Sequence, residues 1–527
     1  MKIFTSFFLF ALLSQQVGYS QEKTPPASPL PPIPISTNLE QALRKPKQVQ
    51  HLALKDASTL PAEIGQLKNL QTLDLSGSNL TQLPTEIGQL SQLKVLNLTG
   101  NQLKELPTSL GQLTNLQVLK LDDNQLQTLP AELKKLVSLK KLTLVDNRLT
   151  EMPAVLKELK NLEDLQVRGN PIPNLLLSAQ ELAVTPKFDN LAEALKNPAK
   201  VYQLELHDLT QLPAEVGQLK NLQTLSLNNN SLKSLPTEIG QLTKLQELHL
   251  LNNQLTQLPA KIGQLQNLKT LNLGFNQLKT LPQELYALTS LEQLNLPHNQ
   301  LSQLPEEISN LSTLKEMNLS GNELSSLPNS VQHLKGLESL HLGENQLSSL
   351  PAGLGGLTNL KSLQLHGNQL SHLPSELGQL KKLETLDLNG NPLASLPASL
   401  GNLSTLKDLR LRSSQLMSLP TELGKLSKLE NLDLWGSQLK SLPAEIGQLK
   451  NLQSLNLYAN KLTTLPKEIG SLANLKGMDL GGNPLTSLPT EIGQLKNLQD
   501  LKLSSEQLPA EQLTKLKSQL LSTKVQF

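Results

Sequence analysis

The residues best suited to bind a partner lie near the C-terminal end of the chain. Arg412, Trp435 and Tyr458 follow one another at intervals of 23 residues, and Arg410 and Asp433 stand two residues before the first two of them. Tryptophan, tyrosine and arginine are the residue types most enriched in the energetic centres of protein interfaces, and a guanidinium can also stack on an indole ring. If a repeated element places these five side chains next to each other, they form a binding patch. The alternative is a tolerated tryptophan packed against an arginine, with no ligand.

Two further groups of residues are weaker candidates. Leu251 and Phe275 suggest a secondary apolar patch. His341 and His366 stand in neighbouring repeats, two positions apart, but a metal site needs more converging ligands than this pair offers. We therefore expect no metal site and interpret the histidines as solvated polar residues.

No set of residues in the sequence is arranged for catalysis. The chain contains no cysteine, which excludes thiol nucleophiles, disulfides and cysteine-based metal sites. No glycine-rich loop ends in Lys-Ser/Thr, and no GxSxG or HExxH motif occurs. Carboxylates such as Asp387, Asp408 and Asp433 have no base or nucleophile arranged with them by spacing. We expect a protein that is not an enzyme, with no catalytic residue and no cofactor.

The composition indicates a core built from repeated, similar layers. The chain has 527 residues, yet aromatic residues make up only 2% of it, although aromatic side chains normally bury much of a globular core. Leucine must fill the core almost alone. The 47 basic and 45 acidic side chains give a net charge of +2, which gives no sign of a polyanionic partner such as nucleic acid.

A repeat of 23 residues positions the candidate residues. Prolines recur at this interval from Pro61 to Pro153 and, after an interruption, from Pro213 to Pro489, within a unit of the form LPxEIGQLxNLxxLxLxxNxL. Each LxL element predicts a short strand whose leucines point one way and whose middle residue points the other. We count six such strands in the first block and fourteen in the second. The asparagine of each unit is expected to satisfy backbone groups, and the glycine after isoleucine to allow a tight outer turn.

This repeat resembles the leucine-rich repeat family over about residues 38–520. Its LPxxIGxL half is similar to the 23-residue type found in bacterial secreted proteins and in the plant and animal Ras-binding-like group. The resemblance implies an α/β fold, a leucine-rich-repeat solenoid. Its curved, parallel sheet of about 20 strands would form the concave face, with short helical or irregular segments on the convex side. The candidate binding residues would then lie on the concave face.

The interruption divides the repeats into two blocks. The pattern from Asn38 to Leu54 recurs from Asn190 to Leu206, and both asparagines are good helix N-caps. We expect an N-terminal cap and first block at 38–177, a linker and second cap-like helix at 178–203, a second block at 204–508 and a C-terminal cap helix at 509–527. One continuous arc with a bulged, helical repeat is the alternative to two capped solenoids.

The first twenty residues have the pattern of a signal peptide. A basic start at Met1-Lys2 precedes an apolar run over residues 3–13, and small residues precede a predicted cleavage between Ser20 and Gln21. The apolar run is too short to span a bilayer, and we expect no transmembrane helix in the mature chain. Residues 21–37 read as a proline-rich spacer. The predicted location is the periplasm, the cell surface or the medium.

Together these features predict a secreted or cell-surface binding protein that recognises another protein on its concave face. A glycan partner is possible, and nucleic acid is not expected. The alternatives are a structural surface spacer and an intracellular signalling scaffold of the Ras-binding-like group. The varied outward residues of the strands, among them Asp74, Lys120 and Arg410, argue against a spacer. The predicted signal peptide argues against an intracellular scaffold.

Overall fold

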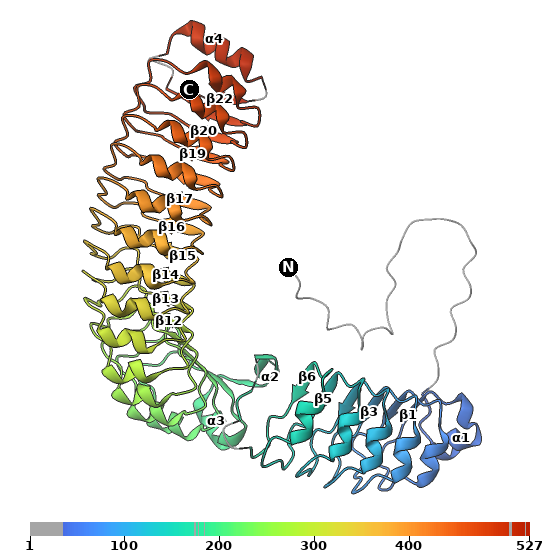
Figure 1. Cartoon of the computed structure of the whole chain (residues 1–527). Helices are drawn as coiled ribbons and strands as arrows, with labels where there is room; N and C mark the ends of the chain where they lie inside the picture. Colours follow the sequence, from blue (N-terminus) through green and yellow to red (C-terminus); the bar gives the residue numbers. More distant parts are fainter. Residues whose placement is uncertain are drawn as a thin grey trace, which may run out of the picture. The chain divides into compact units, whose positions relative to one another are not determined.

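Two compact units make up the chain. The computed structural model describes residues 35–172, 175–177, 179–183, 185–504, 508–521 and 523–526. The first unit is Met1–Ile172 and the second is Pro173–Phe527, and each contains a stack of similar coils (Figure 1). The predicted signal cleavage between Ser20 and Gln21, and most of the spacer at 21–37, lie outside the described residues.

The first unit carries a parallel sheet of six strands in sequence order. It begins with α1 (Leu39–Arg44), and the expected N-cap is confirmed because Oδ1 of Asn38 accepts a hydrogen bond of 3.0 Å from the backbone N–H of Gln41. A short 3-10 helix, η1 (Pro46–Gln48), leads into the sheet. Between successive strands lie five-residue 3-10 helices, from η2 (Ala62–Gln66) to η6 (Ala154–Glu158). The strands are β1 (His51–Ala53), β2 (Thr72–Asp74), β3 (Val95–Asn97), β4 (Val118–Lys120), β5 (Lys141–Thr143) and β6 (Asp164–Gln166).

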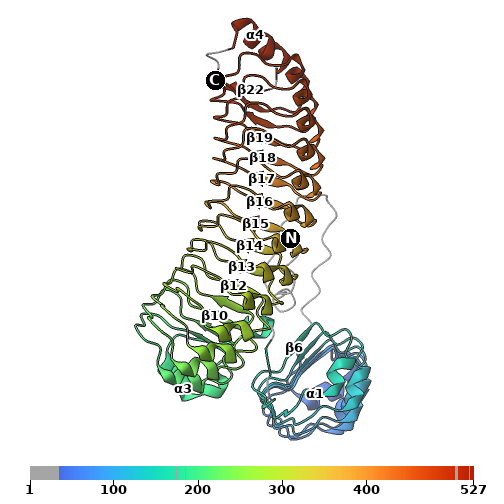
Figure 2. The same ribbon diagram turned by 60° about the vertical axis from the view of Figure 1, so that its left-hand side comes forward.

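The second unit carries a parallel sheet of sixteen strands. It opens with α2 (Ala179–Ala183), β7 (Lys187–Phe188), α3 (Leu191–Lys196) and η7 (Pro198–Lys200), and it closes with α4 (Ala510–Gln519) and β22 (Lys524–Gln526). Its 3-10 helices, from η8 (Ala214–Gln218) to η20 (Thr490–Gln494), follow one another along one side (Figure 2). The repeat strands are β8 (Gln203–Glu205), β9 (Thr224–Ser226), β10 (Glu247–His249), β11 (Thr270–Asn272), β12 (Gln293–Asn295), β13 (Glu316–Asn318), β14 (Ser339–His341), β15 (Ser362–Gln364), β16 (Thr385–Asp387), β17 (Asp408–Arg410), β18 (Asn431–Asp433), β19 (Ser454–Asn456), β20 (Gly477–Asp479) and β21 (Asp500–Lys502).

All twenty predicted strands are present, as β1 to β6 and β8 to β21. The sequence pattern missed β7 and β22, which pair in parallel with β8 and β21. These two strands lack the LxL element, so the repeat could not reveal them. They pair with the first and last repeat strands of the second sheet, where unpaired backbone groups would otherwise remain.

Leucine fills the core layer by layer, as the composition predicted. Leu73 and Leu75 of one coil are fully buried, and Leu73 is the register partner of Leu96 in the next coil. Each fully buried leucine contributes roughly 1.5–3 kcal/mol. The repeat length therefore equals one turn of the coil, and every position meets its equivalent in the neighbouring coil.

The repeated asparagine joins neighbouring coils, as expected. Nδ2 of Asn101 donates to the carbonyl oxygens of Leu75 and Leu98 at 2.9 Å, while its Oδ1 accepts from the N–H of Leu80 at 2.8 Å. The same bonds recur in most coils of both units, forming an asparagine ladder. These bonds satisfy buried backbone groups that no strand pairing reaches.

The physical reason proposed for the repeated glycine was wrong. Left-handed backbone occurs elsewhere, two residues after LxL, as at Gly100 (φ 70°) and Asp123 (φ 52°). The glycine after isoleucine instead permits close packing between coils. A Cβ on Gly88 would lie 2.4 Å from the carbonyl oxygen of Ser109 in the next coil.

Within the described residues, no helix is both long and apolar enough to span a bilayer.

Candidate functional site

Three neighbouring coils bring the five predicted binding residues together. Arg410 ends β17 and Asp433 ends β18, and the two are register partners. Trp435 and Tyr458, just beyond β18 and β19, are 41% and 42% exposed. Their ring centroids lie 6.3 Å apart with planes 6° from parallel. Nε of Arg412 donates to Oδ2 of Asp433 at 2.5 Å. These five residues are called the aromatic patch below.

Both arginines of the aromatic patch are already paired within the chain. Arg410 donates to the two carboxylate oxygens of Asp408 at 3.1 and 3.0 Å and lies 3.6 Å from Asp387. The hydrogen bond to Asp408 raises the pKa of Arg410 above its ordinary value, and Arg412 pairs with Asp433. Charge around the rings is therefore locally compensated. A partner would gain mainly from covering the rings, with hydrogen bonds at their margin.

A glycine that sequence reasoning missed supports the tyrosine ring. A Cβ on Gly481 would lie 2.9 Å from Cδ2 of Tyr458, so the ring lies directly against the backbone of the next coil. One face of Tyr458 thus meets Gly481, and Trp435 stacks on the tyrosine from the coil before. The sequence does show an aromatic residue followed by glycine 23 positions later. This pattern indicates a packing contact only once the position of the ring is known.

The asparagine ladder is interrupted directly behind the aromatic patch. Ser414 and Ser437 replace asparagine there, and their hydroxyl oxygens lie 2.8 Å apart. The Ser437 hydroxyl also donates to the carbonyl oxygen of Leu411 at 3.2 Å. An asparagine at position 414 would accept a hydrogen bond from the N–H of Leu393. With serine there, this N–H binds the carbonyl oxygen of Asn391 instead. Fewer bonds therefore link these coils than link their neighbours.

At the second predicted patch, Phe275 stacks on a ring that the sequence did not predict there. Phe275 is 51% exposed and stacks on His298, with ring centroids 4.4 Å apart. Both residues have left-handed backbone, with φ of 54° and 52°, which costs each roughly 1–2 kcal/mol. Leu251 lies against Gly274, where a Cβ would approach its Cδ1 to 3.0 Å. His298 was interpreted as a solvated polar residue, and the structure adds it to the ring contacts.

The histidines and carboxylates considered for chemistry are held by other contacts. A ring nitrogen of His341 lies 2.9 Å from the hydroxyl of Ser339, and burial lowers the pKa of His341. The carboxylates Asp387, Asp408 and Asp433 each pair with Arg410 or Arg412. Across the part of the chain that the structure describes, no group of three or more His, Cys, Asp and Glu could hold a metal ion.

Family models match most of the chain. The model described as a leucine-rich repeat region matches residues 85–183, 199–295, 283–388 and 398–461. Two further leucine-rich repeat models match residues 450–508, and residues 69–90 and 382–403. No curated protein matches the chain significantly.

Solved structures of similar proteins come from bacteria and plants. A leucine-rich repeat protein of Leptospira interrogans is 36% identical, with a TM-score of 0.58, over 94% of this chain and 100% of that one. The ectodomain of the Arabidopsis thaliana receptor kinase GASSHO1/SCHENGEN3, in complex with Casparian strip integrity factor 2, is 30% identical, with a TM-score of 0.50, over 90% and 69%. The Arabidopsis receptor kinase HAESA, in complex with the peptide hormone IDA and the co-receptor SERK1, is 26% identical, with a TM-score of 0.50, over 92% and 83%.

Proposed function

The chain belongs to the leucine-rich repeat family, and on that basis we propose that it is an exported, non-enzymatic protein that binds a partner protein on the sheet face of its second unit. The aromatic patch is the proposed contact site. The observation that carries this proposal is the stacked, exposed pair of Trp435 and Tyr458, because exposed tryptophan and tyrosine beside arginine typify interface hot spots.

Two features favour a protein over a glycan as the partner. The similar plant receptor structures named above are complexes with peptide or protein ligands. The Arg–Asp pairs around the rings also offer hydrogen-bonding groups at the margin of an apolar centre, which is the usual anatomy of a protein interface.

Export is proposed from the amino-terminal residues alone. The basic start, the short apolar run and the small residues before Gln21 form a cleavable signal pattern. Mass spectrometry of the protein recovered from fractionated cells should find a chain that begins at Gln21, outside the cytoplasm. A chain that retains Met1 and stays in the cytoplasm would favour the intracellular scaffold instead.

The binding site is tested by capturing surface proteins of neighbouring or host cells on the immobilised mature protein, with a glycan array in parallel. Trp435→Ala is expected to lower the affinity for the captured partner at least about tenfold, as hot-spot truncations do. Leu521→Ala removes a side chain that is also exposed, at the far end of the unit, and should leave affinity unchanged. Equal affinity for all three proteins would refute the aromatic patch as the site. Capture of no partner would favour the structural spacer.

A further inference from the structure

The residues that immediately precede the strands of the second unit form a line called the rim column. From β12 to β17 these residues alternate strictly between glutamate and lysine: Glu292, Lys315, Glu338, Lys361, Glu384 and Lys407. Each lysine binds the glutamate of the coil before it. Glu292 pairs with Lys315, and the Glu338–Lys361 and Glu384–Lys407 pairs have N···O distances of 2.6 and 2.7 Å. This part of the column therefore leaves no charge without an opposite partner.

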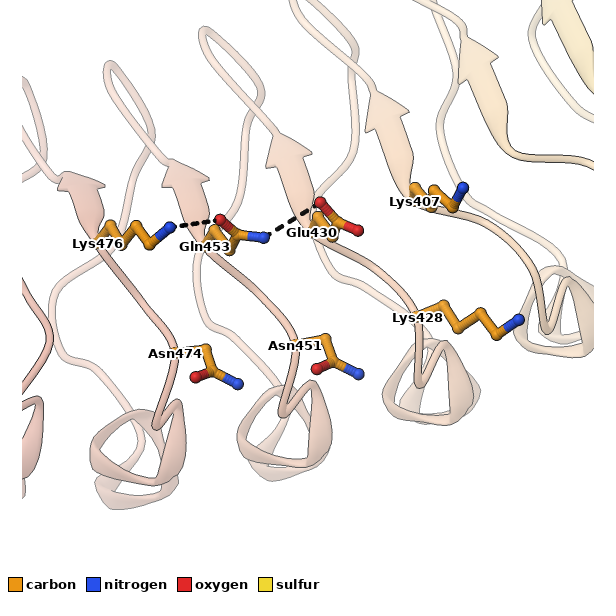
Figure 3. A pocket seen from close by; sticks show the side chains of 7 residues that line it. All are labelled: Lys407, Lys428, Glu430, Asn451, Gln453, Asn474 and Lys476. Atoms are coloured by element: carbon orange, nitrogen blue, oxygen red, sulfur yellow. Dashed lines mark hydrogen bonds between the residues drawn. The ribbon is translucent and has the colours of Figure 1, made fainter. Parts of the chain in front are cut away.

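The alternation ends at Glu430, beside a depression of about 450 Å³ on the side of the coils. Glutamine stands at position 453, where the pattern would place lysine. Nε2 of Gln453 donates to Glu430 at 3.1 Å, and its Oε1 accepts from Lys476 at 2.8 Å (Figure 3). Both charged residues consequently contact a neutral amide instead of an opposite charge.

Lys428, on the wall of the same depression, has no hydrogen bond or ion pair with any described residue. Lysines at the equivalent position of other coils bind an asparagine one coil earlier: Lys244 binds Asn221 at 2.9 Å, and Lys382 binds Asn359 at 2.7 Å. The residue one coil before Lys428 is Thr405, whose hydroxyl donates to the carbonyl oxygen of Lys381. Of the three lysines in the lining, Lys407 is already paired with Glu384, which leaves Lys428 and Lys476 against Glu430. This excess of positive charge favours a negatively charged group.

The rim column already binds a segment of this chain, residues 175–177, at its other end. Gln223 is fully buried, and its amide accepts from the backbone N–H of Leu177 at 2.7 Å and donates to the carbonyl of Leu175 at 3.3 Å. Nε2 of Gln246 donates to the carbonyl of Leu177 at 3.1 Å. Nε2 of Gln246 also donates to Oε1 of Gln223 at 2.7 Å. With Leu175 and Leu177, both glutamines bond backbone groups. A rim glutamine can thus bond the backbone of a neighbouring segment, and these bonds do not depend on the side chains of that segment.

We propose that the depression around Gln453 binds an extended, acidic segment of a partner protein. The Gln453 amide bonds the backbone of that segment, as Gln223 bonds the chain's own, and Lys428 pairs with an acidic side chain. The depression lies before β18, β19 and β20, and the aromatic patch lies just after β18 and β19. About five residues of extended chain separate the two, roughly 17 Å at the rise of a strand. One partner could therefore contact both sites, but the proposal stands without the aromatic patch.

The test uses a fluorescent hexapeptide of alternating Asp and Val, acetylated and amidated at its ends, with the full mature protein. Fluorescence polarisation at low salt should show saturable binding that weakens as salt screens the charges. Gln453→Ala should weaken binding about fivefold, the equivalent of one backbone hydrogen bond. Lys428→Ala should weaken it about threefold and reduce its salt dependence. Lys467→Ala, which removes an exposed lysine on a 3-10 helix, should have no effect.

Two further comparisons make the outcome decisive. A peptide with N-methylated backbone should bind weakly to the wild-type protein, and a Lys-Val peptide should not bind. The proposal is overturned if the wild-type protein binds no peptide, if N-methylation changes nothing, or if Lys467→Ala has the same effect as Lys428→Ala. Trp435→Ala measured with the same peptide separates the two sites, because the peptide alone should bind this variant as it binds the wild-type protein.

Discussion

At the scale of single residues, two ring pairs in the second unit depend on glycine in the following coil. Tyr458 lies against Gly481, and His298 lies against Gly321, where a Cβ would approach its Nδ1 to 2.5 Å. In each pair the other ring, Trp435 or Phe275, stacks on the supported one. The glycine in the following coil, which has no side chain, therefore sets the orientation of the ring that lies against it.

Replacing Gly481 should consequently disturb the aromatic patch. In Gly481→Ala the methyl group displaces the Tyr458 ring, and we expect a loss of about 1–3 kcal/mol, the usual cost of overpacking. Trp435 is the only tryptophan, so its fluorescence during urea unfolding reports this region. Gly477→Ala is the control, because a Cβ there meets nothing within 4 Å, and it should leave both the emission and the midpoint nearly unchanged. Identical behaviour of the two variants would contradict the role of Gly481.

At the scale of elements, bonds between coils decide which strands are held firmly. The asparagine ladder connects most coils to both neighbours, and the glutamate–lysine pairs join the coils between β12 and β17 two by two. The ladder weakens at Ser414 and Ser437, behind the proposed binding surface, because the shorter hydroxyl cannot make all the bonds of an asparagine amide. The strands that carry the proposed binding surface are thus joined to their neighbours by fewer hydrogen bonds.

Restoring the ladder should stabilise this region. In Ser437→Asn the new side-chain amide can donate to backbone carbonyls and accept from a backbone N–H. Asn460 makes bonds of this kind in the next coil. We expect a gain of about 1 kcal/mol for each net hydrogen bond formed, seen as a higher urea midpoint by Trp435 fluorescence. The reverse change, Asn460→Ser, should lower the midpoint. A lower midpoint for Ser437→Asn would mean that the serine coils cannot accommodate the amide.

The ion pairs of the rim column should stabilise the fold at neutral pH and lose this effect at acid pH. The hydrogen bond and charge of Lys361 lower the pKa of Glu338, and those of Lys407 lower the pKa of Glu384. A carboxyl whose pKa is lower in the folded state stabilises the fold above its ordinary pKa, near 4.5. That contribution disappears as the pH falls through the folded value. In Lys361→Met, NMR titration should show the pKa of Glu338 rising toward 4.5, whereas Glu384 should keep most of its shift. An unchanged Glu338 titration would exclude the pairing in solution.

Spacing in the sequence predicted the parts of the fold that recur and missed the parts that occur once. Leu73, Asn101 and the five residues of the aromatic patch lie where the 23-residue interval places them. Gly481 was missed because its role depends on the direction of a neighbouring ring. The backbone bonds of Gln223 were missed because Leu175 and Leu177 belong to no repeat. The ionic partners of the arginines were missed because a strand pattern does not specify side-chain rotamers.

At the scale of the whole molecule, the chain forms two separate sheets in two compact units. The predicted boundaries at 38–177, 178–203 and 204–508 remain predictions. Limited proteolysis should give two stable fragments divided near the unit boundary after Ile172, if the two blocks fold independently. Because the only tryptophan lies in the second unit, unfolding followed by Trp435 fluorescence should not coincide with unfolding followed by far-ultraviolet circular dichroism. Coincident curves would favour one cooperative arc.

The alternating rim column also limits how the gene could change its number of repeats. Recombination between similar repeats can delete one coil without altering the leucine core or the asparagine ladder. Loss of residues 339–361, however, would set Glu338 beside Glu384, whereas loss of residues 339–384 would set Glu338 beside Lys407. Between β12 and β17, deletions or duplications of two coils preserve the charge pairing and those of one coil do not. In this stretch the gene can therefore gain or lose repeats without breaking the charge pairs only two at a time, although a single repeat forms one coil of the structure.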